Sequence, residues 1–197
     1  FEQAQSVGIG DDRERRKCHC GTRNHRVHKY PKQGVKNTST AQITKDAGVA
    51  SGTLFVHYKS KQVLIDSLYL NIKRKAFSSF STAYQIDYSV EQNIKATSKI
   101  IVEYFVSNYN EFVFLEQVDT DPLVSKKVVA LGYENYQDSM KSFKGWAEEG
   151  YFKELDFDLL IQIKFNMIKT LIKYLKSNKL KEVSEKQLDA VWGAIKK

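Results

Sequence analysis

Apolar residues recur at helical spacing over most of the chain beyond residue 37, and short polar stretches divide them into segments. Over residues 37–70 this pattern predicts two short helices followed by a long one. Gly48 lies where the chain must turn between the short helices, a position that suits glycine because it tolerates a positive φ. A threonine or serine at positions 38–40 can cap the first of these helices near Thr40, and Ser60 can cap the long one.

The second short helix is predicted to keep Leu54 inside, while Gly52 would let it approach another backbone closely. The side chains left facing outward or sideways are Ser51, Thr53, Phe55, Val56 and His57. A helix-turn-helix of this kind places its second helix in the major groove of DNA. Small polar side chains there bond phosphates and base edges, and methyl groups can meet thymine methyls. Lys59 and Lys61 would meet phosphates, the alternative being ordinary solvated charge.

The rest of the chain is predicted to be helical as well, so the expected fold class is all-α. The long third helix should bury a stripe of Val63, Leu64, Leu68 and Ile72, flanked by Ile65, Tyr69 and Phe77. We expect a DNA-binding domain over residues 1–80 and a larger helical domain over residues 81–197. The helices of the larger domain are expected from Ser89, over Phe112–Val118, Leu123–Glu149 and Phe157–Leu175, and from Ser184, with Gly150 as a helix stop.

Residues 1–36 have almost no apolar periodicity, although a helix-turn-helix needs a first helix packed behind it. Pro31 would end any helix before it. Three interpretations stay open. The segment could be a basic arm on the phosphate backbone, or a frame slip in the gene sequence could have replaced the natural helix, which an intact mass of the native protein would test. It could also hold a small metal site, although the spacing matches no usual zinc framework. The candidate ligands of that site are Cys18, His19, Cys20, His25 and His28.

The chain of 197 residues has a net charge of +8, and its excess of positive charge lies in the N-terminal part. Residues 1–75 hold 15 lysines and arginines against 6 acidic residues, and residues 76–197 hold 16 against 17. The positive excess therefore lies with the helix-turn-helix, where phosphate contacts would use it. No apolar run is long enough to span a membrane, and no signal peptide is expected. The two neighbouring cysteines form no disulfide framework, which indicates a reducing cytoplasmic setting.

The run Ile43–Lys61 resembles the DNA-binding signature of the TetR family of transcriptional regulators. It has the alanine-glycine-valine turn, the glycine-threonine-leucine-aromatic recognition helix and the aromatic-lysine-x-lysine exit into a long helix. The resemblance implies phosphate or base contacts from Thr53, Phe55, His57, Tyr58 and Lys61. Thr40, Ser51, Gly52, Val56 and Lys59 complete the candidate DNA-binding residues. The family's amphipathic first helix is not supplied by residues 18–33.

The last two helices are apolar on more than one face, which predicts that they pack on more than one side. A homodimer would satisfy them, and a two-fold dimer reads two half-sites about 34–36 Å apart or a multiple of it. The resemblance implies the same, with these helices pairing as a four-helix bundle. The alternative is a larger monomeric core. The expected interface residues are Met167, Leu171, Tyr174, Leu188, Val191, Trp192 and Ile195.

Aromatic residues of the larger domain suggest a pocket for an apolar or aromatic small molecule, although most of them should be core. The candidate lining residues are Tyr104, Phe105, Phe112, Tyr133, Tyr136, Phe143 and Phe165. The resemblance implies that an effector bound there moves the DNA-reading heads apart. No charged residue stands out in the sequence as a counter-ion for that effector.

The sequence contains none of the phosphate loops, metalloprotease pairs, nucleophile elbows or Cys-x-x-Cys sites that mark common enzymes. We therefore expect a homodimeric regulator, a repressor that binds a palindromic operator and is released by an effector. No cofactor and no metal are expected. The alternatives are a dimeric small-molecule-binding protein with an impaired DNA-binding head, and an enzyme on a helical scaffold.

Overall fold

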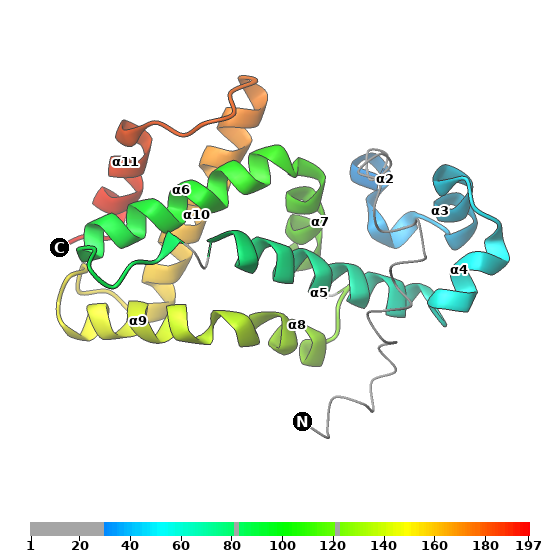
Figure 1. The fold of residues 1–197 in the computed structure, drawn as a ribbon, viewed down its shortest axis with the longest axis horizontal. Helices are drawn as coiled ribbons and strands as arrows, with labels where there is room; N and C mark the ends of the chain where they lie inside the picture. Colours follow the sequence, from blue (N-terminus) through cyan, green and yellow to red (C-terminus); the bar gives the residue numbers. More distant parts are fainter. Residues whose placement is uncertain (1–29, 81–82, 121–122) are drawn as a thin grey trace. The chain divides into compact units, whose positions relative to one another are not determined.

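The computed structural model describes residues 30–80, 83–120 and 123–197, and over these ranges the chain is built from helices without strands (Figure 1). The three candidate explanations for the basic segment, including the metal ligands between Cys18 and His28, fall on residues outside the described part. The chain forms two compact units that meet between Lys59 and Ser60. Helix α5 (Lys61–Phe80) packs on helices of the second unit.

The first unit holds α2 (Tyr30–Asn37), α3 (Thr40–Ala47) and α4 (Ser51–His57). The backbone of α2 is kinked at Gly34, whose φ of 73° and ψ of 153° are accessible to glycine. Pro31 does not exclude a helix here, because it occupies the first turn of α2, where proline is tolerated. Thr38 follows the helix and is buried, and its hydroxyl donates to the Gly34 carbonyl at 2.9 Å.

The second unit begins with α5, whose N-terminus is capped by the Ser60 hydroxyl as expected, at 3.2 Å from the Val63 amide. Its buried stripe differs from the predicted one. Val63 is exposed, Leu64 and Leu68 are half-buried, and the fully buried positions are Ile65, Tyr69, Ile72 and Ala76. The stripe is rotated because α5 packs on both α6 (Val90–Ser107) and α8 (Lys126–Tyr133), so its inner face points between them.

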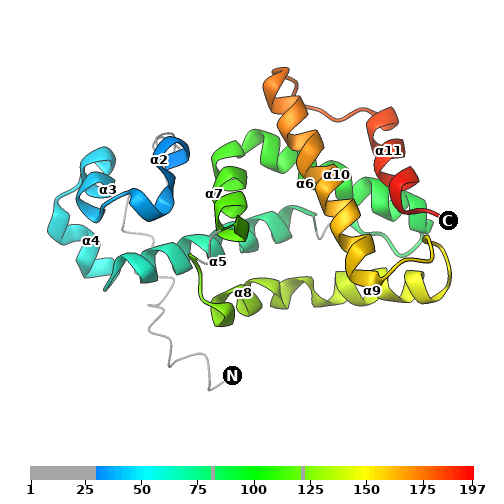
Figure 2. The ribbon, with the colours of Figure 1, turned by 180° about the vertical axis from the view of Figure 1, so that it is seen from behind.

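Helix α10 (Phe157–Ser177) crosses α6 and is joined to α11 (Glu185–Ile195) by a loop (Figure 2). Both α6 and α11 begin with the capping boxes expected at Ser89 and Ser184. Side chains of α6, α10 and α11 form two buried apolar clusters, one around Val102 and Ile168 and the other around Ile94 and Leu160. Lys95 of α6 pairs with Glu91 and with Asp189 of α11, which ties these helices together at the surface.

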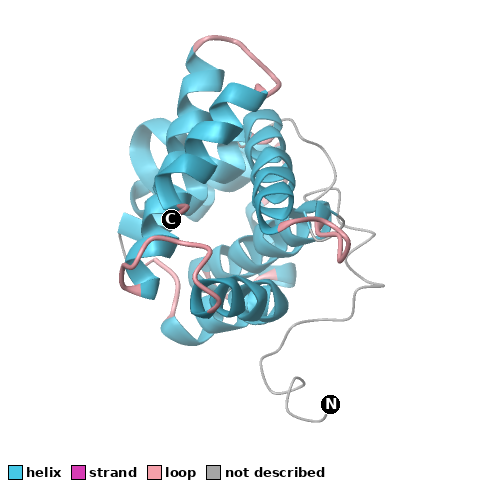
Figure 3. Ribbon diagram, turned by 90° about the vertical axis from the view of Figure 1, so that its left-hand side faces the viewer, coloured by secondary structure: helices cyan, strands magenta, loops and turns pink. Residues whose placement is uncertain are grey.

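The remaining helices are α7 (Tyr109–Thr120) and α9 (Gln137–Glu148), with a 3-10 turn over Glu134–Tyr136 between α8 and α9. The helix expected over Leu123–Glu149 therefore starts at Lys126 and changes to a tighter coil in the middle. Figure 3 shows helices and connecting loops only within the described residues. None of the described helices is long and apolar enough to cross a membrane.

Gly132 is the point where α8 approaches α5 most closely. A Cβ atom there would lie 2.6 Å from Cε1 of Tyr69, a ring that is only 2% exposed and has little room to move. We expect Gly132→Ala to lower the free energy of unfolding by about 1–3 kcal/mol, the usual cost of overpacking.

Gly145 of α9 provides a matched control, because nothing lies within 4 Å of a Cβ atom added there. Gly145→Ala should raise stability by up to about 1 kcal/mol through helix propensity alone. Urea unfolding of both variants measures the difference. Equal effects of the two substitutions would contradict the close approach of α8 to α5.

Candidate DNA-binding surface and ligand site

The turn between α3 and α4 is set by local hydrogen bonds. The Ser39 hydroxyl accepts from the Gln42 amide at 3.1 Å and caps α3. Gly48 ends the helix in the left-handed conformation, with a φ of 67°. The next amide, that of Val49, returns to the Thr44 carbonyl at 3.0 Å. These bonds satisfy orphan groups at both ends of α3 and fix where α4 starts.

Two buried side chains hold α4 against α3. Leu54 is 4% exposed and faces inward, as expected. Thr44 is also buried, and its hydroxyl donates to the Ala41 carbonyl at 3.0 Å and lies 3.4 Å from the Ser51 hydroxyl. The sequence pattern does not predict this role of Thr44. A threonine in a short helix can be a buried contact between helices or an exposed surface residue, and the sequence alone does not distinguish the two.

The opposite face of α4 is exposed and carries most of the predicted DNA-binding residues. Val56 is 80% exposed and Phe55 is 50% exposed, so two large apolar side chains point into solvent. Exposed residues also include Ser51, Gly52, Thr53, His57 and Lys59, while Thr40 and Tyr58 are half-buried. Lys61 is half-buried and belongs to the second unit as the first residue of α5.

Gly52 does not play the role expected of it. Within the part of the chain that the structure describes, no atom outside this stretch of α4 lies within 4 Å of a Cβ added at this position, so no other described backbone approaches the helix there. The absence of a side chain instead leaves a gap on the exposed face of α4. Such a gap suits close approach by a binding partner rather than packing inside the protein.

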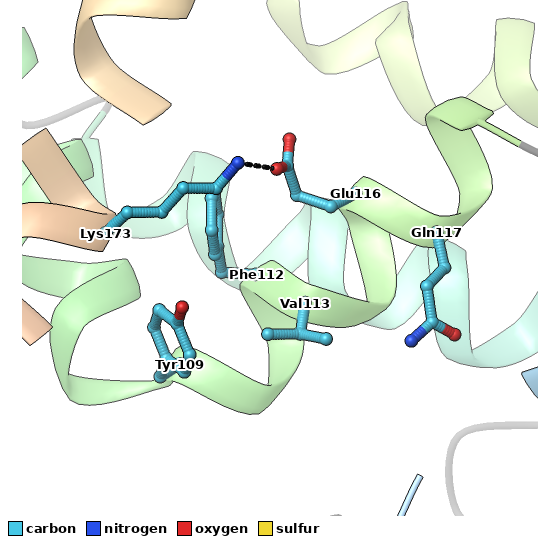
Figure 4. Close-up of a pocket in the computed structure, with 6 residues that line it drawn as sticks. All are labelled: Tyr109, Phe112, Val113, Glu116, Gln117 and Lys173. Carbon is cyan, nitrogen blue, oxygen red and sulfur yellow. Dashed lines mark ion pairs between the residues drawn. The ribbon is translucent and has the colours of Figure 1, made fainter. Parts of the chain in front are cut away.

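A cavity of about 320 Å³ lies between α7 and α10 (Figure 4). Its lining residues are Tyr109, Phe112, Val113, Glu116, Gln117 and Lys173. Glu116 pairs with Lys173 at 2.5 Å and with Lys169 at 3.0 Å. Burial opposes ionisation of this carboxyl, but the bonds to the two lysines prevail and the pKa of Glu116 is lowered. The two charged residues that line the cavity, Glu116 and Lys173, are therefore already paired with each other.

A second, smaller cavity of about 50 Å³ lies between α6 and α9. Asn93, Thr97 and Ile101 line it from α6, Ser139, Ser142, Phe143 and Trp146 line it from α9, and Tyr84 completes the wall. Tyr84 stacks on Trp146 with their ring centroids 6.1 Å apart. The Phe143 ring is shared with a lysine of α10, since the ammonium of Lys164 lies 5.0 Å from its centroid.

The seven residues expected to line one pocket are distributed over several environments. Phe112 lines the larger cavity and Phe143 the smaller one. The Tyr104 hydroxyl instead donates to Glu111 at 2.7 Å, and Phe105 packs beside it on the apolar core. Burial, followed by the bond to Glu111, raises the pKa of Tyr104, so this phenol stays protonated.

The other three members of that set contact lysines. Tyr133 and Tyr136 surround the ammonium of Lys73, which lies 4.1 Å from the Tyr133 centroid and 5.5 Å from that of Tyr136. Phe165 is 38% exposed, with Lys164 at 5.7 Å. The contacts of Lys73 join α5 to α8 and to the 3-10 turn, whereas Lys164 and Phe165 are neighbours within α10. None of these three aromatic residues lines the two cavities.

The expected dimer residues also separate into two groups. Met167 is half-buried and Tyr174 is 50% exposed, so both retain solvent-accessible area that a second copy of the chain would cover in a dimer. The other five, Leu171, Leu188, Val191, Trp192 and Ile195, are at most 9% exposed and pack inside the chain's own clusters. Their apolar character is thus explained by the core of the subunit, and we correct the prediction for these five residues.

Comparison with known proteins agrees with this geometry. The sequence model of "Bacterial regulatory proteins, tetR family" matches residues 31–68, which include most of α2, all of α3 and α4, and the start of α5. Residues 31–68 are a tetR-family DNA-binding segment. No curated protein sequence matches the chain significantly.

Solved structures of tetR-family regulators share the fold of the chain. A regulator from Shewanella sp. PV-4 is 20% identical, with a TM-score of 0.73 over 87% of this chain and 94% of the other. One from Marinobacter aquaeolei VT8 is 16% identical, with a TM-score of 0.76 over 86% and 91%. The ketosteroid regulator KstR2 of Mycobacterium tuberculosis is 18% identical, with a TM-score of 0.60 over 87% and 91%. The chain therefore has the fold and the DNA-binding domain of a tetR-family transcription regulator.

Lys164 is a residue whose importance the sequence did not indicate. It lies on the inner face of α10, and burial lowers the pKa of its ammonium to about 8. Among the described residues, no carboxylate pairs with it and no hydrogen bond holds it; its contacts are the rings of Phe143 and Phe165. A lysine in an apolar helix looks like a solvated charge until its neighbours are known.

Proposed function

We propose that this chain is a sequence-specific DNA-binding transcription regulator that acts as a homodimer and represses transcription until a small molecule binds. The observation that supports it best is the exposed face of α4. Phe55 and Val56 expose apolar surface, whose hydration is unfavourable, and Gly52 leaves space beside them on the same helix. A helix that exposes apolar and small polar groups next to lysines suits a DNA groove, where methyl groups and phosphates are both available.

We propose that the dimer forms through the exposed sides of α10 and α11. On α10, Leu159 is 44% exposed and Tyr174 50%, and both lie outside the buried stripe, with half-buried Ile163 between them. On α11, Ala190 is exposed, and a Cβ added at Gly193 would meet nothing within 4 Å. Small residues allow two helices to approach closely, so two copies of this face can pair as a four-helix bundle.

The effector would act through α5. This helix packs on α6 and α8 in the second unit, and residues 58–60 connect it in sequence to α4. A ligand that favours one position of α5 over another would change the placement of the recognition helices, which is the differential binding that any switch requires. The smaller cavity, which is lined in part by α6, offers a place for such a ligand.

Three substitutions test the assignment of the DNA-binding residues. Lys61→Ala should weaken binding to all sequences alike and make it less sensitive to salt, because a lysine contacts phosphate. Thr53→Ala and His57→Ala should change the preference among sequences, at about 1–3 kcal/mol for each lost base contact.

Fluorescence anisotropy with a selected operator and with single-base variants of it separates the two kinds of effect. Lys99→Ala, an exposed lysine on α6, is the control for general charge. If Thr53→Ala, His57→Ala and Lys61→Ala all bind DNA as the wild type does, α4 is not the recognition helix.

A further inference from the structure

A polar layer interrupts the apolar packing between α6 and α10. On α6, Ser98 lies one helical turn after Ile94 and one turn before Val102. On α10, Lys164 lies one turn after Leu160 and one turn before Ile168. Ile94 and Leu160 belong to one apolar cluster, and Val102 and Ile168 belong to the other. Ser98 and Lys164 therefore occupy the layer between the two clusters.

Both groups of this layer can donate hydrogen bonds, and neither has an acceptor. Ser98 is 0% exposed and its hydroxyl is the buried side-chain atom without a partner among the described residues. Lys164 contacts only aromatic rings there, with no carboxylate or carbonyl. The Ser98 hydroxyl is fully buried and Lys164 is half-buried. Leaving both donors unpaired in apolar packing is unfavourable, and a negatively charged acceptor would offset that cost.

The smaller cavity adjoins this layer. Thr97 and Ile101, the neighbours of Ser98 on α6, line it, and its Phe143 wall is the ring contacted by Lys164. A cavity of about 50 Å³ has room for a group the size of a carboxylate, since about 10–15 Å³ measured in this way is enough for one water molecule. The aromatic pair Tyr84 and Trp146 lines the same cavity and offers apolar contact to the rest of a ligand.

We infer that this layer binds the carboxylate of an otherwise apolar small molecule, with Lys164 as its counter-charge and Ser98 as a second donor. This inference rests on the proposed function for the meaning of the ligand as an effector. The larger cavity is the weaker candidate for such an anion, because its two charged groups, Glu116 and Lys173, already form an ion pair. A charge-assisted bond in a buried site is stronger than a neutral one, which favours a carboxylate over an alcohol of the same size.

Thermal shift and calorimetric titration of the full chain without DNA test this site, using octanoate and 4-phenylbutyrate as probes and 1-octanol as the neutral comparison. At least one carboxylate should stabilise the wild type and bind roughly tenfold or more tightly than 1-octanol. Lys164→Met keeps the length of the side chain and removes its charge, so it should lose that preference. Ser98→Ala should weaken carboxylate binding by a smaller factor. Lys99→Met, at an exposed position of α6, should behave like the wild type.

Lys164→Met should also melt at a higher temperature than the wild type without any ligand, because it removes an unpaired charge that is half-buried in apolar packing. The inference is overturned if neither carboxylate stabilises the wild type, if 1-octanol binds as tightly, or if Lys164→Met binds carboxylates unchanged. DNA binding plays no part in these measurements. A chain that binds carboxylates through Lys164 but ignores DNA would refute the proposed function alone, and the reverse result would refute the anion site alone.

Discussion

Gly52→Glu is expected to weaken operator binding by about 100-fold or more while the melting temperature stays at or above that of the wild type. The Cβ atom of the added side chain would meet no atom of the described residues within 4 Å, and glycine within a helix is less favourable than alanine by about 0.5–1 kcal/mol. On DNA, the same side chain would fill the gap beside Thr53 and bring a negative charge to the phosphates. A two-fold dimer carries this change twice, which multiplies its effect.

The control for this variant is Lys141→Glu on α9, whose side chain is 75% exposed. It changes the net charge by two units, whereas Gly52→Glu changes it by one, so a general electrostatic effect would be larger in the control. Anisotropy titrations and melting curves measured on both variants separate binding from folding. Unchanged DNA binding by Gly52→Glu would show that the exposed face of α4 does not contact DNA.

Tyr174→Glu is expected to convert the dimer into monomers at micromolar concentration and thereby to abolish tight operator binding. The side chain is 50% exposed in the single chain, so a charge there should not disturb its core. In the proposed interface, the two-fold axis would bring symmetry-related copies of this face together and bury the new carboxylates. Burial of unpaired charge at the centre of an interface of ordinary size, about 1,200–2,000 Å², is strongly unfavourable.

Sedimentation equilibrium measures the dimer directly. Ile86→Glu is the matched control, because Ile86 is an 87% exposed apolar residue that lies before α6 and outside the proposed face. It should leave the dimer intact. A Tyr174→Glu protein that remains dimeric, with the circular dichroism of the wild type, would exclude α10 from the interface.

The parts of the fold that the sequence predicted well are those that depend on local chemistry. Ser39, Gly48, Ser60 and Ser89 act within a few residues of their own position, so their helix-capping and turning roles can be inferred without the rest of the structure. The inward position of Leu54 follows in the same way from the short helix around it.

The misassigned elements are those whose neighbours lie far away in the sequence. In α5, an apolar pattern exists for two overlapping stripes, and only the packing on α6 and α8 selects the one that contains Tyr69. In α11, Leu188 and Val191 are apolar because the subunit's own α6 and α10 cover them. A sequence does not distinguish a helix face covered by its own chain from one covered by a partner.

The ligand site shows the same limitation. Aromatic residues such as Tyr104 and Tyr136 suggested a pocket, but they are engaged with Glu111 and Lys73. The residues that characterise the anion site, Ser98 and Lys164, are of types that usually face water. Only the apolar neighbours above and below them in the helices make their unpaired state evident.

The central claim is that the exposed face of α4, presented twice by a dimer, recognises a palindromic operator. The most direct test is a titration of the wild-type protein against a site selected from random DNA, compared with scrambled DNA of equal length at several salt concentrations. We expect a selected site with two-fold symmetry, nanomolar-scale affinity for it, and binding to scrambled DNA that is weaker by at least about 1,000-fold. Affinity for both should fall steeply with salt, because lysines displace counterions from phosphates. Equal affinity for selected and scrambled DNA, or a selected site without two-fold symmetry, would contradict it.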